Sequence, residues 1–284
     1  MTWTPYVELM KLKIGGMIAL TAVVSYLSMM ESFDVVHLIV LITIMLLGAS
    51  SSAVFNHWYD RDIDQKMERT ANRPLATAQI NPDHALWMAK GLLVAGVGLG
   101  IWFFNPMVGL HLFLGAFFYG IVYTVWLKRR TWLNIVLGGL AGSFAVMAGA
   151  ASVNPDMYVL PLLLALVLFF WTPSHFWSLA IHLKKEYQKV GVPMLPVVVG
   201  DKKAAQYIFI NTILLVASSM LPWVFDKLGL IYLSGALLAG GLFLFGNVQL
   251  LKNPTCENGW KNFTGSMRYL GILFIAIVID KNFY

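Results

Sequence analysis

Residues 35–75 read VVHLIVLITIMLLGASSSAVF and then, without a break, NHWYDRDIDQKMERTANRPL. The first part has 21 residues and is almost entirely apolar, and about 20 apolar residues are enough to cross a bilayer as a helix. The second part contains eight charged residues. This sharp change predicts a membrane-spanning helix that leads directly into a charged segment at the membrane surface.

Apolar stretches of similar length recur along the whole chain, separated by short loops that hold nearly all of the charge. Of the 284 residues, 58% are hydrophobic and only 12% are charged, against roughly 25% charged residues in an ordinary soluble domain. We expect nine membrane-spanning helices, at residues 14–30, 35–55, 85–104, 107–127, 133–151, 158–181, 205–225, 229–251 and 267–280. The sequence therefore predicts an all-α, polytopic membrane protein.

Seventeen of the 20 Lys and Arg residues fall on one side of this arrangement, in segments 11–13, 61–73, 128–130, 184–203 and 252–268. The other side holds only Lys227 and Lys281, and Lys90 lies within the third predicted helix. Because cytoplasmic loops carry an excess of Lys and Arg, we expect a cytoplasmic N-terminus and an external C-terminus. The division of the bases among membrane loops also explains the net charge of +6 without nucleic acid as a partner.

Three oxygen-bearing side chains, those of Asn56, Asp60 and Asp64, follow the second apolar stretch at intervals of four residues. If the helix continues into this segment, the three lie on one face over about 12 Å. Mg²⁺ prefers oxygen ligands and is usually held by one or two carboxylates together with substrate phosphates. We therefore predict that these are metal-binding, catalytic residues for a magnesium diphosphate. The alternative is that the acids only solvate a cytoplasmic loop and pair with neighbouring bases.

Four basic residues of the same segment surround these acids: Arg61, Lys66, Arg69 and Arg73. Their side chains can hold phosphate oxygens through charge-assisted hydrogen bonds, and Arg can do so in a bidentate way. We expect these four residues to bind the diphosphate.

The register Asn-x₃-Asp-x₃-Asp resembles the first aspartate-rich motif of the UbiA superfamily of intramembrane prenyltransferases, and DRDIDQKMERTANRPL at 60–75 is similar to its heme O synthase branch. Two further segments are similar to cytoplasmic connections of that branch, namely YTVWLKRRTWLNIVLGGLAG at 123–142 and WTPSHFWSLAIHLKKEYQKVGVPMLPVVVG at 171–200. The chain departs from the branch at Ser174, at the pair Ala145 and Val146, and at Ala150, where relatives have prolines or an aromatic residue.

The resemblance covers most of the chain and implies a single intramembrane prenyltransferase domain over residues 1–284, with nine helices around a central cavity. The implied reaction transfers a farnesyl group from farnesyl diphosphate to a vinyl group of heme B, with addition of water, to give heme O, and uses Mg²⁺ as cofactor. Heme A synthase or a terminal oxidase is then a candidate partner besides membrane lipid. The implied location is a bacterial or archaeal plasma membrane, with the site on the cytoplasmic side.

The resemblance also implies roles for residues near the ends of the fourth and sixth predicted helices. Tyr123 is expected near the reacting carbon. Lys128 and Arg129 are expected near the diphosphate, although the same bases could form a stop-transfer cluster. His175 is a candidate contact for the heme iron, and a hydrogen-bonded histidine at a helix interface is the alternative.

The connection between the sixth and seventh predicted helices has Glu186 as its only acid. Lys184 and Lys185 beside it are expected to contact phosphate, and Glu186 is a candidate ligand of a second Mg²⁺. Members of the superfamily that prenylate aromatic acids carry a second aspartate-rich motif in this connection. Its absence here argues against a prenyltransferase acting on an aromatic acid or quinone precursor.

A transporter would also be polytopic, and its site would typically contain ionisable groups near the bilayer midplane. No Asp, Glu, Lys or Arg falls at the centre of a predicted helix. The sequence therefore favours an enzyme over a transporter.

Overall fold

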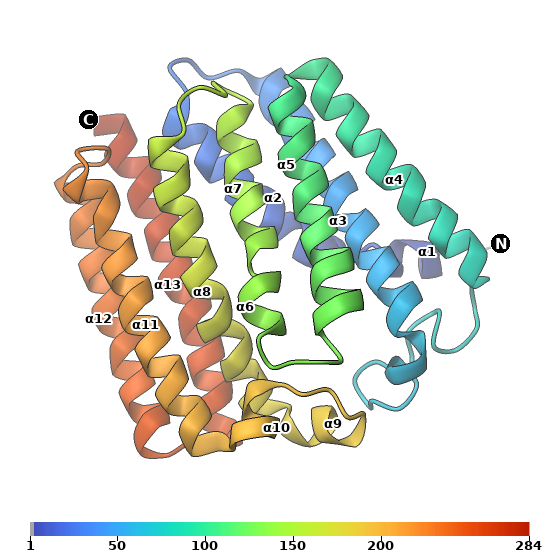
Figure 1. Ribbon diagram of the computed structural model, residues 1–284. Helices are drawn as coiled ribbons and strands as arrows, with labels where there is room; N and C mark the ends of the chain where they lie inside the picture. Colours follow the sequence, from blue (N-terminus) through green and yellow to red (C-terminus); the bar gives the residue numbers. More distant parts are fainter. Residues whose placement is uncertain (1–2, 284) are drawn as a thin grey trace.

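The computed structural model describes residues 3–283, which are helical almost throughout (Figure 1). Nine helical segments in this range are long and apolar enough to cross a membrane. They are α2 (Leu12–Met29), α3 (Val35–Asp64), α4 (Pro82–Phe103), α5 continuing into the π-helix η1 (Pro106–Phe117 and Phe118–Leu127), α6 with α7 (Asn134–Gly138 and Leu140–Ala151), α8 (Val159–His182), α11 (Asp201–Val224), α12 (Leu230–Lys252) and α13 (Cys256–Phe283). No β-strand occurs between residues 3 and 283, so the predicted all-α membrane fold is confirmed.

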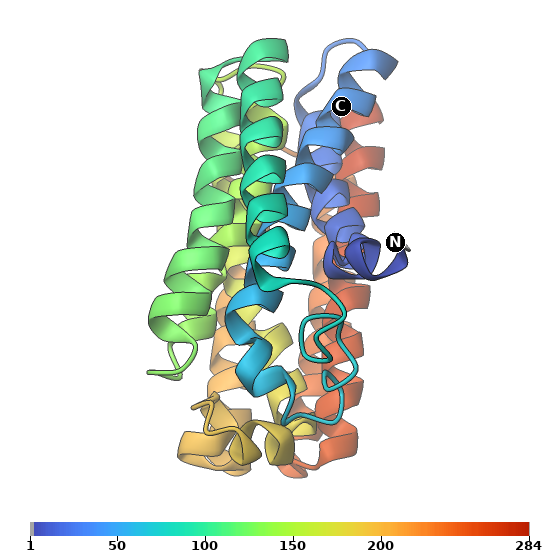
Figure 2. The same cartoon turned by 90° about the vertical axis from the view of Figure 1, so that its right-hand side faces the viewer.

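The long helices run side by side, and one end of the bundle carries most of the shorter elements (Figures 1 and 2). At this end lie the loop of residues 65–81, which follows α3, and the short helices α9 (Lys184–Lys189) and α10 (Leu195–Val199). The C-terminus lies at the opposite end. A third short helix, α1 (Thr4–Leu9), precedes α2.

Polar residues in the loops start several of these helices. Asp34 accepts a hydrogen bond from the backbone N–H of Val36 (2.8 Å) before α3, and Asn105 accepts one from that of Met107 (3.0 Å) before α5. Pro106 then occupies the first turn of α5, where its missing N–H costs no helical hydrogen bond. The starts of α3 and α5 are therefore set locally by residues outside the apolar stretches.

Two of the predicted helix boundaries are wrong. α3 does not end at residue 55 but continues to Asp64, and the last helix begins at Cys256 rather than at residue 267. The first turns of α13 are polar because they pack on α8 through small and polar residues. Asn262 donates a hydrogen bond to the hydroxyl of Ser178 (2.8 Å), and Gly259 lies against the backbone of the same turn. Hydropathy alone cannot reveal such a helix, because its buried face is not apolar.

Close packing of small residues joins α2 to α7. A Cβ atom placed on Gly149 of α7 would lie only 2.1 Å from the carbonyl oxygen of Ala22 in α2. Helices in membranes associate largely through such close backbone approaches, because lipid supplies no hydrophobic driving force between them. Position 149 therefore requires glycine, because α2 and α7 are too close together to leave room for a Cβ atom.

Interhelical hydrogen bonds tie α8 to α11. The hydroxyls of Ser174 and Thr212 are 2.8 Å apart, and the Asn211 amide donates to both Ser174 Oγ (2.8 Å) and the Phe170 carbonyl (2.6 Å). Pro173 lies inside α8, where it removes one backbone hydrogen bond. Ser174, one of the departures from the related branch, thus supplies a polar contact beside the proline.

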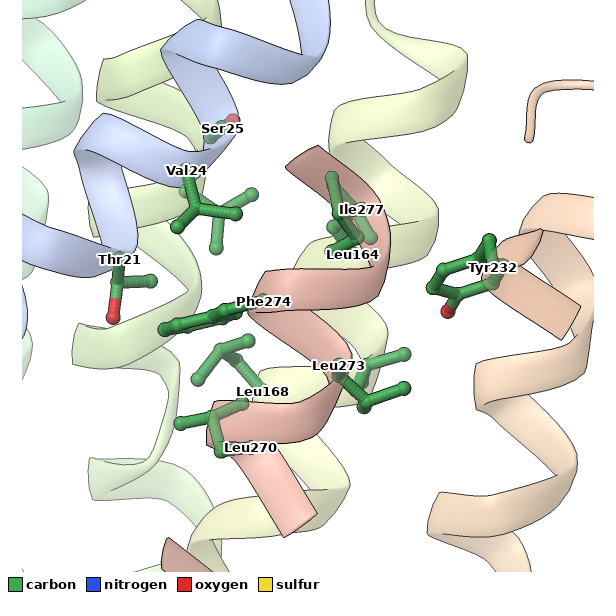
Figure 3. Close-up of a pocket in the computed structure, with 12 residues that line it drawn as sticks. Thr21, Val24, Ser25, Leu164, Leu168, Tyr232, Leu270, Leu273, Phe274 and Ile277 are labelled. Carbon is green, nitrogen blue, oxygen red and sulfur yellow. The ribbon is translucent and has the colours of Figure 1, made fainter. Parts of the chain in front are cut away.

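A narrow cavity lies between α2, α7, α8, α12 and α13 (Figure 3). Its walls are almost entirely apolar and include Val24, Leu168, Leu270 and Phe274, with Thr21 among the few polar residues. The volume is about 10 Å³, which is room for about one water molecule. A larger apolar ligand could enter this space only if the lining side chains moved.

Candidate active site

The last three turns of α3 carry the row of Asn56, Asp60 and Asp64 on one face. Their exposed fractions are 4%, 0% and 3%, so all three are buried although two of them are acids. The helical spacing of four residues predicts this common face, and the continuation of α3 to Asp64 produces it. Buried carboxylates require partners, and the structure supplies them from other segments.

Asp60 is the centre of the row. It forms ion pairs with Lys128 and with Arg129, whose Nη2 lies 3.3 Å from Asp60 Oδ1. The Asn56 amide donates a hydrogen bond to Asp60 Oδ2 (2.7 Å) and lies 3.3 Å from the hydroxyl of Thr124. Both basic residues follow η1, so the end of that helix is fastened to α3 at the row.

The loop of residues 65–81 closes over Asp64. Arg73 Nη1 lies 2.7 Å from Asp64 Oδ2, and the Thr70 hydroxyl donates to the Asp64 carbonyl (3.0 Å). The loop is anchored by Leu75 and Ile80, which are buried in a hydrophobic cluster with residues of α1, α3 and α4. Arg73 is thereby held next to the row although it is nine residues from Asp64 in sequence.

A third segment reaches the row from the N-terminus. Lys11, between α1 and α2, donates a hydrogen bond from Nζ to Asn56 Oδ1 (3.2 Å). Loss of hydration and the nearby charges of Arg73 and Lys128 hold the pKa of Lys11 well below its ordinary value. Sequence reasoning missed this residue, because a lysine that flanks an apolar stretch looks like a topological charge.

Arg129 also binds Asp62, the acid between the two acids of the row. Two guanidinium nitrogens lie 2.7 and 2.6 Å from the Asp62 carboxylate oxygens, and this pairing raises the pKa of Arg129 above its ordinary value. The guanidinium also lies 5.0 Å from the centre of the Tyr59 ring. Asp62 and Tyr59 therefore position Arg129 beside Asp60, which the sequence did not predict.

Tyr123 lies on η1 close to the charged row. The Lys128 ammonium is 6.0 Å from the centre of its ring, and the rings of Tyr119 and Tyr123 are 5.5 Å apart. Gly138 leaves space for the ring, because a Cβ atom there would lie 2.9 Å from Tyr123 Cβ. The π-helical turn and this glycine together place the Tyr123 ring near Lys128.

Other predicted site residues have different surroundings. Lys66 and Arg69 are exposed in the loop, and the Arg61 guanidinium packs on the Trp58 ring at 5.4 Å from its centre. None of the three forms a hydrogen bond or ion pair with Asp60 or Asp64 in the described part of the chain.

The basic residues after α8 are not joined to the row either. Lys184 pairs with Asp201 (3.0 Å), and Lys185 is exposed. Glu186 has one buried carboxylate oxygen with no hydrogen-bond partner in the residues that the structure describes. Lys184, Lys185 and Glu186 belong to α9, which lies at the same end of the bundle as the end of α3 (Figures 1 and 2).

His175 packs between α8 and α13. Its Nδ1 lies 2.7 Å from the Ser266 hydroxyl, and its ring stacks on Trp171 with 4.2 Å between ring centres and lies against Phe263 at 4.3 Å. These contacts are those of a hydrogen-bonded histidine at a helix interface, the alternative that the sequence left open.

The donor set of the row suits a hard cation that keeps other ligands. Asn56, Asp60 and Asp64 offer two carboxylates and one amide oxygen, and residues 3–283 contain no cluster of three or more His, Cys, Asp or Glu residues able to hold a metal. A site with only two carboxylates matches Mg²⁺ completed by water and substrate phosphates.

Comparison with known proteins identifies the family of the chain. Residues 17–277 match the UbiA prenyltransferase family. Protoheme IX farnesyltransferase 1 of Paramagnetospirillum magneticum is 52% identical over 99% of this chain and 100% of its own length, and the Hahella chejuensis protoheme IX farnesyltransferase is 40% identical over 98% and 93%.

Two solved structures share the fold at low sequence identity. A structure described as digeranylgeranylglyceryl phosphate synthase has a TM-score of 0.83 at 20% identity, covering 99% of both chains. A UbiA homolog from Archaeoglobus fulgidus bound to DMAPP and Mg²⁺ has a TM-score of 0.72 at 16% identity, covering 96% of this chain and 99% of that one. The resemblance found in the sequence is thus confirmed: the chain is an integral membrane protein that belongs to the UbiA prenyltransferase family.

Proposed function

We propose that this prenyltransferase transfers a farnesyl group from farnesyl diphosphate to a vinyl group of heme B. One observation carries the proposal: two buried carboxylates, Asp60 and Asp64, are each paired with cations brought in from other segments. A magnesium diphosphate supplies both signs of charge. Its metal can replace the basic side chains as the partner of the carboxylates, and its phosphate oxygens can replace the carboxylates as partners of the basic side chains. The similarity to protoheme IX farnesyltransferases supports the choice of substrates.

Asn56, Asp60 and Asp64 would hold Mg²⁺, and Glu186 is a further candidate ligand because one of its oxygens has no partner within residues 3–283. When bound, Mg²⁺ would supply Lewis-acid stabilisation of the charge that builds on the leaving diphosphate. Arg73, Lys128 and Arg129 would share that role through charge-assisted hydrogen bonds, and their ion pairs with Asp60 and Asp64 support this assignment.

In the proposed reaction, the C–O bond between farnesyl and diphosphate breaks, and the electron pair leaves with the diphosphate. Tyr123 lies beside Lys128, so its ring can face the positive charge that develops on the allylic carbon. The vinyl group then forms the new C–C bond, and the cation left next to the porphyrin ring takes up water and loses a proton. The net change on heme B is the addition of a farnesyl group to one vinyl carbon and of a hydroxyl group to the other.

Lys184 and Lys185 have a supporting role in this proposal. The ion pair of Lys184 with Asp201 is a partly exposed contact, which costs little to exchange for a phosphate oxygen. Arg61, Lys66 and Arg69 would add positive potential around the row rather than direct contacts. His175 is assigned to helix packing, because its ring is enclosed by Trp171, Phe263 and Ser266.

The direct test is incubation of the purified protein with farnesyl diphosphate, Mg²⁺ and heme B, followed by mass spectrometry. We expect the mass of the porphyrin to rise by one farnesyl group plus one hydroxyl group, and hydroxybenzoate offered instead should remain unmodified. Prenylation of hydroxybenzoate without reaction on heme B would assign the protein to the aromatic-acid prenyltransferases and refute the proposed acceptor.

The proposed orientation places the site, the loop of residues 65–81 and the N-terminus on the cytoplasmic side. Basic residues concentrate at this end of the bundle, as the positive-inside rule requires. We expect single cysteines at Lys66, Arg130, Lys185 and Lys261 to react only from the cytoplasm, and cysteines at Glu31, Asp156 and Lys227 only from outside. The labels need a Cys256→Ser background, because Cys256 is exposed. A mixed pattern within either group would overturn the orientation.

A further inference from the structure

Lys11 is the one cation in contact with the row that meets no carboxylate within residues 3–283. Arg73 pairs with Asp64, and Lys128 and Arg129 both pair with Asp60. The Lys11 ammonium donates instead to the neutral amide oxygen of Asn56, 3.2 Å away. An ammonium has three donors, and a desolvated cation without an anion is costly. Lys11 therefore has charge and donors left for an anion.

The backbone around Lys11 explains how its side chain reaches the row. Lys11 has a left-handed conformation (φ 48°, ψ 48°) at the break between α1 and α2, which residues other than glycine rarely adopt. α1 is held in place by Leu9, which is fully buried in the cluster that contains Val54 and Leu75. Lys13, only two residues further on, is exposed. The turn thus sends Lys11, and not Lys13, to α3.

We propose that Lys11 binds an anionic oxygen of the prenyl diphosphate beside the metal-binding row, a proposal that rests on the proposed function. Asn56 links Lys11 to the acids of the row, because its side-chain oxygen accepts a hydrogen bond from Lys11 and its side-chain NH₂ donates one to Asp60. Lys11, Arg73 and Lys128 come from three separate segments, and the positive charges of Arg73 and Lys128 lie near Lys11.

A carboxylate of the acceptor has the same chemistry as a partner for an ammonium, so the test must separate the two anions. Lys11→Met removes the charge but keeps a straight side chain, Lys11→Arg keeps the charge, and Lys13→Met is the matched control. The dissociation constant for farnesyl diphosphate with Mg²⁺ is measured without acceptor, and the KM values for farnesyl diphosphate and heme B are measured in turnover.

We expect Lys11→Met to raise the dissociation constant for farnesyl diphosphate roughly 10- to 150-fold, the effect of losing one charge-assisted hydrogen bond. Lys11→Arg should recover most of the affinity, Lys13→Met should match the wild type, and the KM for heme B should not change. If Lys11→Met does not fold, Lys11→Asn replaces it, because Asn tolerates the left-handed conformation.

An unchanged dissociation constant in a folded Lys11→Met variant would overturn the proposal. A rise confined to the KM for heme B would overturn it as well, because Lys11 would then bind a carboxylate of the acceptor. If the wild type binds farnesyl diphosphate with Mg²⁺ but leaves heme B unmodified, the proposed acceptor fails while the binding test of Lys11 still stands.

Discussion

Replacing Asp60 by Asn should lower turnover by at least about a hundredfold to a thousandfold while the protein still inserts into the membrane. Asp60 is fully buried and is the common partner of Lys128, Arg129 and the Asn56 amide. Asn preserves the shape of the side chain but not the negative charge that would bind the metal. Asp64→Asn should have an effect of the same size, because it removes the other carboxylate of the row.

The matched control is Asp83→Asn, which makes the same change at an exposed position at the start of α4. The measurement is kcat with farnesyl diphosphate, heme B and Mg²⁺, together with gel filtration to verify folding. Asp83→Asn should retain normal turnover. Near-normal turnover in both Asp60→Asn and Asp64→Asn would remove the basis for the metal-site assignment.

Gly149→Ala should strongly lower the stability of the protein. The new Cβ atom would lie 2.1 Å from the Ala22 carbonyl oxygen, which is backbone and cannot rotate away. Either α2 and α7 separate or the substituted protein fails to fold. Overpacking of this kind typically costs about 1–3 kcal/mol and more when the backbone must shift. We expect a lower melting temperature and a lower yield of monodisperse protein in detergent.

Gly142→Ala is the matched control on the same helix, because a Cβ atom there meets nothing within 4 Å. Alanine favours a helix over glycine by roughly 1 kcal/mol, so this variant should be as stable as the wild type or more stable. Equal melting temperatures for Gly149→Ala and the wild type would show that α2 and α7 can separate at no cost.

The nine spans could be predicted from the sequence because lipid imposes a simple requirement, a run of about 20 apolar residues. The row of Asn56, Asp60 and Asp64 could be predicted for a similar reason, since their spacing matches the period of a helix. The beginning of α13 could not, because its buried face uses Gly259 and Asn262 against α8. In the first turns of this helix, the buried residues are small or polar rather than apolar.

The residues that pair with the row are brought there by contacts between distant segments. Only some of these residues could be identified from the sequence around them. Arg73 and Lys128 stand out because they lie in motif-like segments that resemble the family. Lys11 has no such signal, because its position depends on a left-handed turn and on the docking of α1 through Leu9. The pairing of Arg129 with Asp62 likewise requires η1 to end beside α3.

We propose that the row of Asn56, Asp60 and Asp64 binds a divalent metal together with the diphosphate. Mn²⁺ in place of Mg²⁺ allows this to be measured directly, by electron–nuclear double resonance on protein incubated with farnesyl diphosphate. We expect a ³¹P coupling to bound Mn²⁺ in the wild type that is lost in Asp64→Asn and retained in Asp83→Asn. A ³¹P-coupled Mn²⁺ signal of the same strength in Asp64→Asn would show that Asp64 does not hold the metal.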